Sequence, residues 1–169
     1  MSVVNSHRTY EEALAAVKHL ADEGKFEEAR RGAVRPSSII YDGLGDAYIS
    51  CAYDDISEAD AYIDGAFYRR EIRPLIVGKE FGKAVSLLNK ISCGELRDQY
   101  LAELVDMMIN PNHRSAAISQ IHQSSALYQK LEEYAEKENS YIQRHQLSPQ
   151  SELTERVTRL MELLKISQS

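Results

Sequence analysis

Apolar residues along most of the chain recur every three or four positions, which is the spacing of amphipathic helices. The first such helix is predicted to open at Thr9–Glu12, where a hydroxyl precedes a glutamate by three residues as in a capping box, and to end at Gly24. A short second helix is expected over about 25–34, closed by Pro36. No segment alternates apolar and polar residues as strands do. The predicted buried face of the first helix is Ala13, Ala16, Val17 and Leu20.

The middle of the chain predicts four more helices. A third should start at Ser37 or Ser38, and a fourth should span about 58–73 and stop before Pro74, because proline lacks a donor N–H and clashes with the preceding turn. A fifth begins near Gly78, and a sixth follows the capping box Ser92–Glu95.

The C-terminal third predicts two longer helices. One should run from about 114 to 145 and the other should start at Ser148, with Pro149 as its first residue. The expected buried seam of the long helix is Ala117, Ile121, Ser124, Tyr128, Leu131, Ala135 and Ile142. That of the last helix is Leu153, Val157, Leu160, Met161 and Leu164. We expect an all-α protein of about eight helices and one domain over 1–169, with a helical array over 9–110 and a C-terminal hairpin over 113–166.

One short pattern occurs three times. Asp-x-Tyr-(Ile/Leu) appears at 46–49, 60–63 and, more weakly, at 98–101. The first two copies predict consecutive short helices with the same buried positions; one kinked helix is the alternative. The aspartates Asp46, Asp60 and Asp98 are either first-turn acids favoured by the helix dipole or a row of functional carboxylates.

Two turns resemble each other and also resemble a known repeat. Gly24 is followed by Phe26 and Ala29, and Gly78 by Phe81 and Ala84 with one extra residue. These stretches, with Ala16 and Val17 in place of the family's Leu-Gly pair, are similar to the centre of a tetratricopeptide (TPR) repeat. The resemblance covers about the first 110 residues and shows no strict repeat period. It implies a right-handed solenoid of stacked antiparallel hairpins whose surface binds peptides or proteins.

Charge and composition narrow the partner classes. The chain has 43% hydrophobic and 27% charged residues and a net charge of −6, which argues against a nucleic-acid or acidic-membrane binder and favours basic partners. It contains no apolar run long enough for a membrane span and no secretory signal pattern. Its two cysteines suit a reducing compartment. These features predict a cytoplasmic protein; an exported bacterial effector is the alternative.

Sequence motifs of catalysis do not occur in the chain. It has no phosphate-binding glycine loop, no GxSxG and no HExxH, and its five histidines lack metal-ligand spacing. We therefore expect no enzyme activity, no cofactor and no metal.

Two arginine clusters are the candidate binding residues. Each lies near the end of a predicted helix and alternates with tyrosines, so the arginines either offset a helix dipole or clamp an acidic ligand. The candidate partner-binding residues are Arg30, Arg31, Arg35, Tyr62, Arg69, Arg70 and Arg73.

The leading functional hypothesis is a non-enzymatic scaffold that binds another protein or an extended peptide. A chaperone-like version would be similar to the small acidic TPR chaperones of type III secretion. One alternative is a homo-oligomeric coiled-coil structural protein, such as a homodimer, that pairs with a second chain through Tyr128 and Leu131. Another is a sensor of an acidic ligand that uses the arginine clusters.

Overall fold

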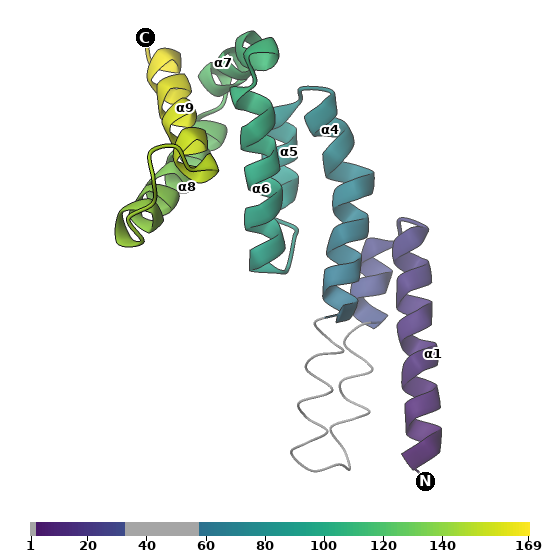
Figure 1. Ribbon diagram of the computed structural model, residues 1–169. Helices are drawn as coiled ribbons and strands as arrows, with labels where there is room; N and C mark the ends of the chain where they lie inside the picture. Colours follow the sequence, from purple (N-terminus) through teal and green to yellow (C-terminus); the bar gives the residue numbers. More distant parts are fainter. Residues whose placement is uncertain (1–2, 33–57) are drawn as a thin grey trace. The chain divides into compact units, whose positions relative to one another are not determined.

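The computed structural model describes residues 3–32 and 58–169, and it gives the backbone alone for residues 3–10 and for Ala13. Within these ranges the chain contains helices and turns but no strand (Figure 1), which confirms the all-α prediction for this part. The predicted third helix, the repeat copy at 46–49, Cys51 and Arg35 lie outside the described residues. The chain divides into two compact units, Met1–Glu71 with Ile91–Leu96, and Ile72–Lys90 with Arg97–Ser169.

The first unit is built on α1 (Val3–Asp22) and the helical segments 26–32 and 58–67. Helix α1 begins at Val3, so the prediction that Thr9 caps it is wrong; residues 3–9 contain neither Gly nor Pro to interrupt a helix. Ala16 is exposed, against expectation. Small residues dominate the buried cluster, which lets the helices approach closely; it consists of Val17, Ala21, Ala29, Ala59, Ile63 and Ala66.

The sequence predicts that the helix starting near residue 58 stops before Pro74. In the structure it continues past this proline. It passes through a π-helical turn, Tyr68–Ile72, into α4 (Arg73–Val77), where Pro74 occupies the first turn. Proline inside an α-helix lacks the N–H donor and clashes with the carbonyl four residues earlier. A wider π-helical turn directly before the proline changes this spacing, which explains how the chain stays helical.

The second unit contains the remaining helices. They are α5 (Phe81–Leu88), most of α6 (Gly94–Ile109), a 3-10 turn (Pro111–His113), α7 (Arg114–Gln123), α8 (Ser125–Arg144) and α9 (Glu152–Ser167). Helices α8 and α9 form an antiparallel hairpin, and α7 packs against both (Figure 1). Two side-chain contacts attach α6 to this hairpin. Arg156 holds Asp106 through two bonds of 2.7 and 3.1 Å, and Lys137 contacts Asp98 at 2.7 Å.

The predicted long helix over 114–145 is wrong, because the chain breaks at Ser124. This residue has an extended backbone (φ −132°, ψ 105°), and its hydroxyl accepts the N–H of Leu127, so it caps α8 instead of joining the buried seam. Tyr128 is half-buried, whereas Leu127 and Tyr134 are buried. The break divides the predicted seam between α7 and α8.

The last helix starts later than predicted. Ser151, not Ser148, is the N-cap, and its hydroxyl accepts the N–H of Thr154 at 3.2 Å. The Ser148 hydroxyl accepts the N–H of Gln150 within the preceding turn. On α9 the predicted seam is confirmed at Val157, Leu160 and Leu164, but Met161 is 51% exposed and Leu163 is buried in its place.

Two of the turns are alike in detail. At Gly24 (φ +82°) the N–H groups of residues 24 and 25 bond to the carbonyls of residues 21 and 20, which is the Schellman pattern. At Lys79 (φ +61°) the N–H groups of residues 79 and 80 bond to those of residues 76 and 75 in the same way. The number of residues between Gly24 and Lys79 also separates Phe26 from Phe81 and Ala29 from Ala84. The extra residue seen in the sequence is therefore not an insertion, because Lys79 rather than Gly78 is equivalent to Gly24.

A third turn of this kind follows α8, with Gln146 at φ +50°. Side chains with a Cβ are strained at positive φ. Replacing Lys79 or Gln146 with Gly should therefore raise the free energy of unfolding by about 0.5–1 kcal/mol. Lys130→Gly, inside α8, is the control and should lower it by about 1 kcal/mol. Urea unfolding followed by circular dichroism measures the free energy of unfolding of all three variants. If Lys79→Gly lowers it as much as Lys130→Gly does, the prediction is contradicted.

Candidate binding site

Arg30, from the first predicted cluster, has its guanidinium engaged inside the first unit. Its Nη2 donates to Asp64 Oδ1 at 2.9 Å and its Nη1 donates to Ser92 Oγ at 2.7 Å. The Asp64 carboxylate is fully buried and also accepts the backbone N–H groups of Ser92 and Cys93, at 3.2 and 2.8 Å. Arg30 is thus one partner of a buried carboxylate that joins three segments of the same unit.

Asp60 lies one turn before Asp64 on the same helix. It is half-buried, and its pKa is raised by that burial and by the neighbouring Asp64 charge, while Arg30 acts in the opposite direction. The corresponding aspartate of the third repeat copy, Asp98, is exposed and ion-paired. The two described aspartates of the predicted row therefore have different surroundings.

Arg70, from the second cluster, caps the C-terminus of α1. Its Nη1 donates to the Asp22 carbonyl at 2.9 Å. A Cβ placed on Gly24 would lie 2.9 Å from both Nε and Cζ of this arginine, so the guanidinium packs directly on the turn. Arginine at a helix C-terminus offsets the helix dipole, as one of the two interpretations predicted. The helix that it stabilises is α1, not its own.

Tyr62 also turns towards the end of α1. Its hydroxyl donates to Asp22 Oδ1 at 2.7 Å, and this hydrogen bond raises the pKa of the Tyr62 phenol. The Lys18 ammonium lies 5.3 Å from the centre of the same ring. Arg31, Arg69 and Arg73 are exposed, and Arg35 lies outside the described residues. Since Arg30 and Arg70 have intramolecular partners, neither cluster presents all three of its arginines to a ligand.

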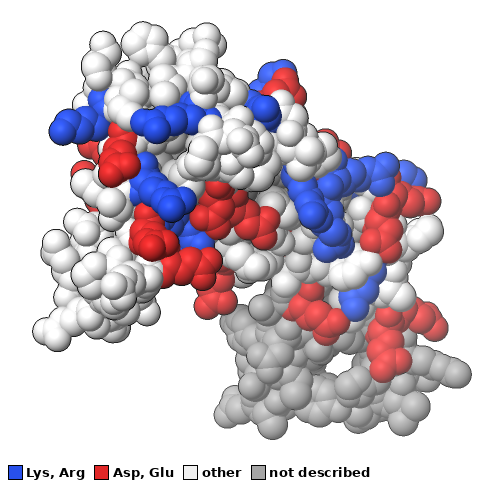
Figure 2. All heavy atoms as spheres, turned by 45° about the horizontal axis from the view of Figure 1, so that its top comes forward, with Lys and Arg blue, Asp and Glu red and all other residues white. Residues whose placement is uncertain are grey.

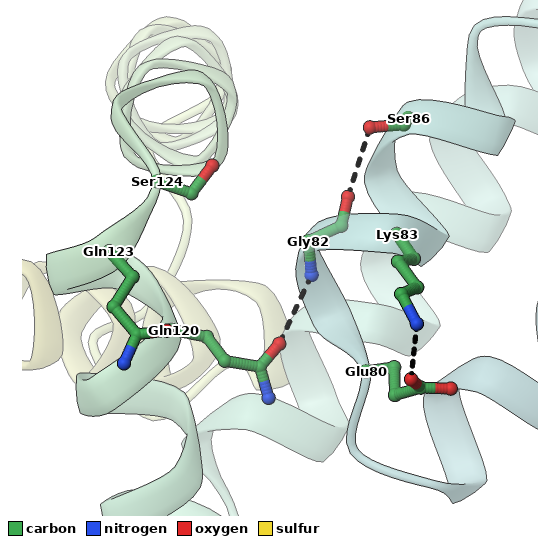
Figure 3. Close-up of a pocket in the computed structure, with 7 residues that line it drawn as sticks. All are labelled: Glu80, Gly82, Lys83, Ser86, Gln120, Gln123 and Ser124. Atoms are coloured by element: carbon green, nitrogen blue, oxygen red, sulfur yellow. Dashed lines mark hydrogen bonds and ion pairs between the residues drawn. The ribbon is translucent and has the colours of Figure 1, made fainter.

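A polar depression of about 500 Å³ lies between α5 and α7 in the second unit (Figure 3). Gln120 crosses it: its Oε1 accepts the N–H of Gly82 at 3.2 Å, and its Nε2 donates to the carbonyl of Lys79. Across the rest of the depression, Ser86 bonds to the Gly82 carbonyl and Lys83 pairs with Glu80. These groups bond mainly to one another, and Gln120 provides the α5 N-terminus with the cap that Glu80 does not supply.

A second groove, of about 300 Å³, runs along the α8–α9 hairpin. It differs from the polar depression in its lining, because four of its lining residues are apolar or aromatic and only part of its rim is charged. The apolar residues are Tyr128, Ala135, Met161 and Leu164. The polar residues are Glu132, Glu136, Asn139, Lys165 and Gln168. We refer to this site as the α8–α9 groove.

Met161 is the exposed hydrophobic side chain of the α8–α9 groove. Most large apolar side chains of α9 are buried, but Met161 keeps half of its surface accessible at the groove. Methionine is unbranched and adapts to differently shaped partners, which suits a binding surface. Ile166 is also exposed, at 40%, but it does not line this groove.

Charges on the groove rim are unequal. Glu132 and Glu136 stand one turn apart on α8, and Lys165 stands on α9. Neither glutamate's carboxylate forms an ion pair or hydrogen bond with any described residue. Figure 2 shows acidic and basic side chains interleaved on the face that it draws.

Metal sites and membrane-spanning helices were also sought among the described residues. No group of three His, Cys, Asp or Glu side chains there is arranged to hold a metal ion. His113 and His122 each place Nδ1 3.1 Å from a backbone carbonyl, of Met107 and Ser167 respectively. None of the described helices combines the length and the apolar character that a bilayer crossing demands.

Comparison with known proteins gives no relative for this chain: no family model, no curated protein and no solved structure matches it.

Proposed function

We propose that the protein is a non-enzymatic helical scaffold that binds a segment of another protein in the α8–α9 groove. The observation that carries this proposal is the exposure of Met161 above a partly apolar groove. A concave apolar strip with a polar rim is the usual form of a peptide-binding site on helices. Elsewhere in the described chain every buried side-chain polar atom has a hydrogen-bond partner, which is the behaviour expected of a structural interior.

The repeat architecture is part of the same proposal. Two helix–turn–helix segments with equivalent turns, at Gly24 and at Lys79, support an array of hairpins of the TPR-like kind. In such an array the terminal hairpin covers the core of its neighbour and keeps one outer face for a partner. The α8–α9 hairpin would have this position.

The groove, rather than the arginine clusters, is the proposed site because of the partners that the arginines already have. Arg30 and Arg70 are held by Asp64 and by the α1 C-terminus. Releasing either of them to a ligand would leave a buried carboxylate or a helix end without its cation.

A display library of random peptides, panned against the whole protein, tests the proposal. Enriched peptides should bind about tenfold more weakly to Met161→Ser, because truncation of a buried anchor at an interface costs more than 1 kcal/mol. Ile166→Ser is the matched control, since it removes an exposed side chain of the same helix outside the groove. Absence of any enriched peptide, or equal loss in both variants, would contradict the proposal.

A further inference from the structure

We infer that the occupant of the α8–α9 groove is a basic amphipathic helix. The inference rests on the proposed function and goes beyond it by naming the conformation and the charge of the partner. Three observations carry it: the direction in which the groove runs, the absence of backbone partners in its lining, and the unpaired acidic row on its rim.

The groove follows the axis of α8. Its lining residues on this helix are Tyr128, Glu132, Ala135, Glu136 and Asn139, which share one face of the helix because each lies three or four positions from another of the set. This face extends for about 16 Å, the length of roughly three helical turns. A helix of that length fits beside α8 and α9 as a further helix and presents apolar side chains at the same intervals.

A helical partner also satisfies its own backbone. The walls of the groove are helices α8 and α9, whose main-chain groups bond along the helix, so the groove offers side chains and no sheet edge. An extended peptide would need acceptors and donors for each of its backbone groups. An amphipathic helix needs only apolar anchors at i, i+3, i+4 and i+7.

The charge of the partner follows from the rim. Glu132 and Glu136 both line the groove from α8, and their carboxylates have no cationic partner among the described residues. Lysine or arginine on the polar face of the incoming helix would pair with both, and the chain's net charge of −6 would attract a basic partner at longer range. The same net charge opposes occupation of the groove by a second copy of this chain.

The test uses three fluorescent synthetic peptides of about 18 residues, five helical turns. The first has Leu at i, i+3, i+4 and i+7 with Lys elsewhere. The second keeps the Leu positions and replaces every Lys with Glu. The third has the composition of the first in scrambled order, without an apolar face. Fluorescence anisotropy with the whole protein measures the binding of each.

The Lys peptide should bind at least about tenfold more tightly than either of the other two. Met161→Ser and the double change Glu132→Gln/Glu136→Gln should each weaken the binding of the Lys peptide severalfold. Only the double change should make this binding less sensitive to salt concentration. The control Glu27→Gln/Glu28→Gln removes two exposed carboxylates from the first unit and should leave the binding of the Lys peptide unchanged. Ile166→Ser should bind as the unchanged protein does.

Other results separate the two proposals. If the Glu peptide binds equally well and Met161→Ser weakens both, the groove takes helices but the basic-partner inference is wrong. If Met161→Ser changes the binding of none of the three peptides, the basic-helix inference is overturned. The proposed function is overturned as well only if library panning also enriches no peptide. Sedimentation that shows concentration-dependent self-association, abolished by Met161→Ser, would identify a second copy as the occupant and overturn the inference.

Discussion

Replacement of Asp64 by alanine is expected to lower the free energy of unfolding by about 3 kcal/mol, because it removes one partner of a buried, hydrogen-bonded charge pair. The carboxylate has no accessible surface and accepts bonds from Arg30 and from two backbone N–H groups, those of Ser92 and Cys93. In the variant these donors lose their acceptor. The Arg30 side chain is 23% exposed, so water can solvate part of it, which places the expected loss at the lower end of the range for buried pairs.

Asp64→Asn should not restore the stability. An amide has one oxygen and an NH₂ group, and that NH₂ would face a donor from Arg30 or from the backbone. Hydrogen exchange of the Ser92 and Cys93 amides provides a local measurement, since both donate to Asp64 and should exchange much faster in either variant. Urea unfolding measures the overall loss.

Asp60→Asn is the control, because it removes a carboxylate one turn away on the same helix. The pKa of Asp60 is raised in the folded protein, so its contribution to stability is fully present below the unfolded pKa and is lost as the pH rises through the folded pKa. When ionised, Asp60 therefore opposes folding, so Asp60→Asn should leave the protein equally stable or slightly more stable. A loss at Asp60→Asn as large as at Asp64→Ala would refute the assignment of Asp64 as the structural carboxylate.

Local patterns explain which parts of the fold the sequence predicts. The end of α1 at Gly24 and the start of α6 near Ser92 depend on residues within one turn of the helix end, and both are confirmed to within a residue or two. The start of α9 is less clearly marked by its local sequence. Ser148 and Ser151 are both residues that favour an N-cap, and in the structure it is Ser151 that caps α9.

Long-range contacts explain most of what the sequence leaves open. The side chain of Asp64 is 28 residues from Ser92, and no periodicity indicates that the two meet. One signal was present: Asp64 is the only charged residue in the apolar stretch 61–68, and an isolated charge there suggests a buried partner. The α8–α9 groove had no such signal, because the break at Ser124 and the exposure of Met161 depend on how α7, α8 and α9 pack.

Leucine in place of Ala29 or Ala84 is expected to lower the free energy of unfolding by about 1–3 kcal/mol, because each alanine is fully buried where the next helix crosses. Ala29 belongs to a cluster in which most side chains are small, so three added carbons have no space to fill. Ala84 stands at the equivalent position after the Lys79 turn. If the two hairpins are built alike, the two losses should be similar.

Two exposed alanines give matched controls, since they undergo the same chemical change without the steric conflict. Ala16→Leu on α1 and Ala126→Leu on α8 should each alter stability by no more than about 0.5 kcal/mol. Urea midpoints for all four variants decide the matter, because the change in side-chain volume is identical and only burial differs. Harmless leucines at Ala29 and Ala84 would show that these helix crossings are wider than the structure has them, and the equivalence of the two hairpins would lose its structural basis.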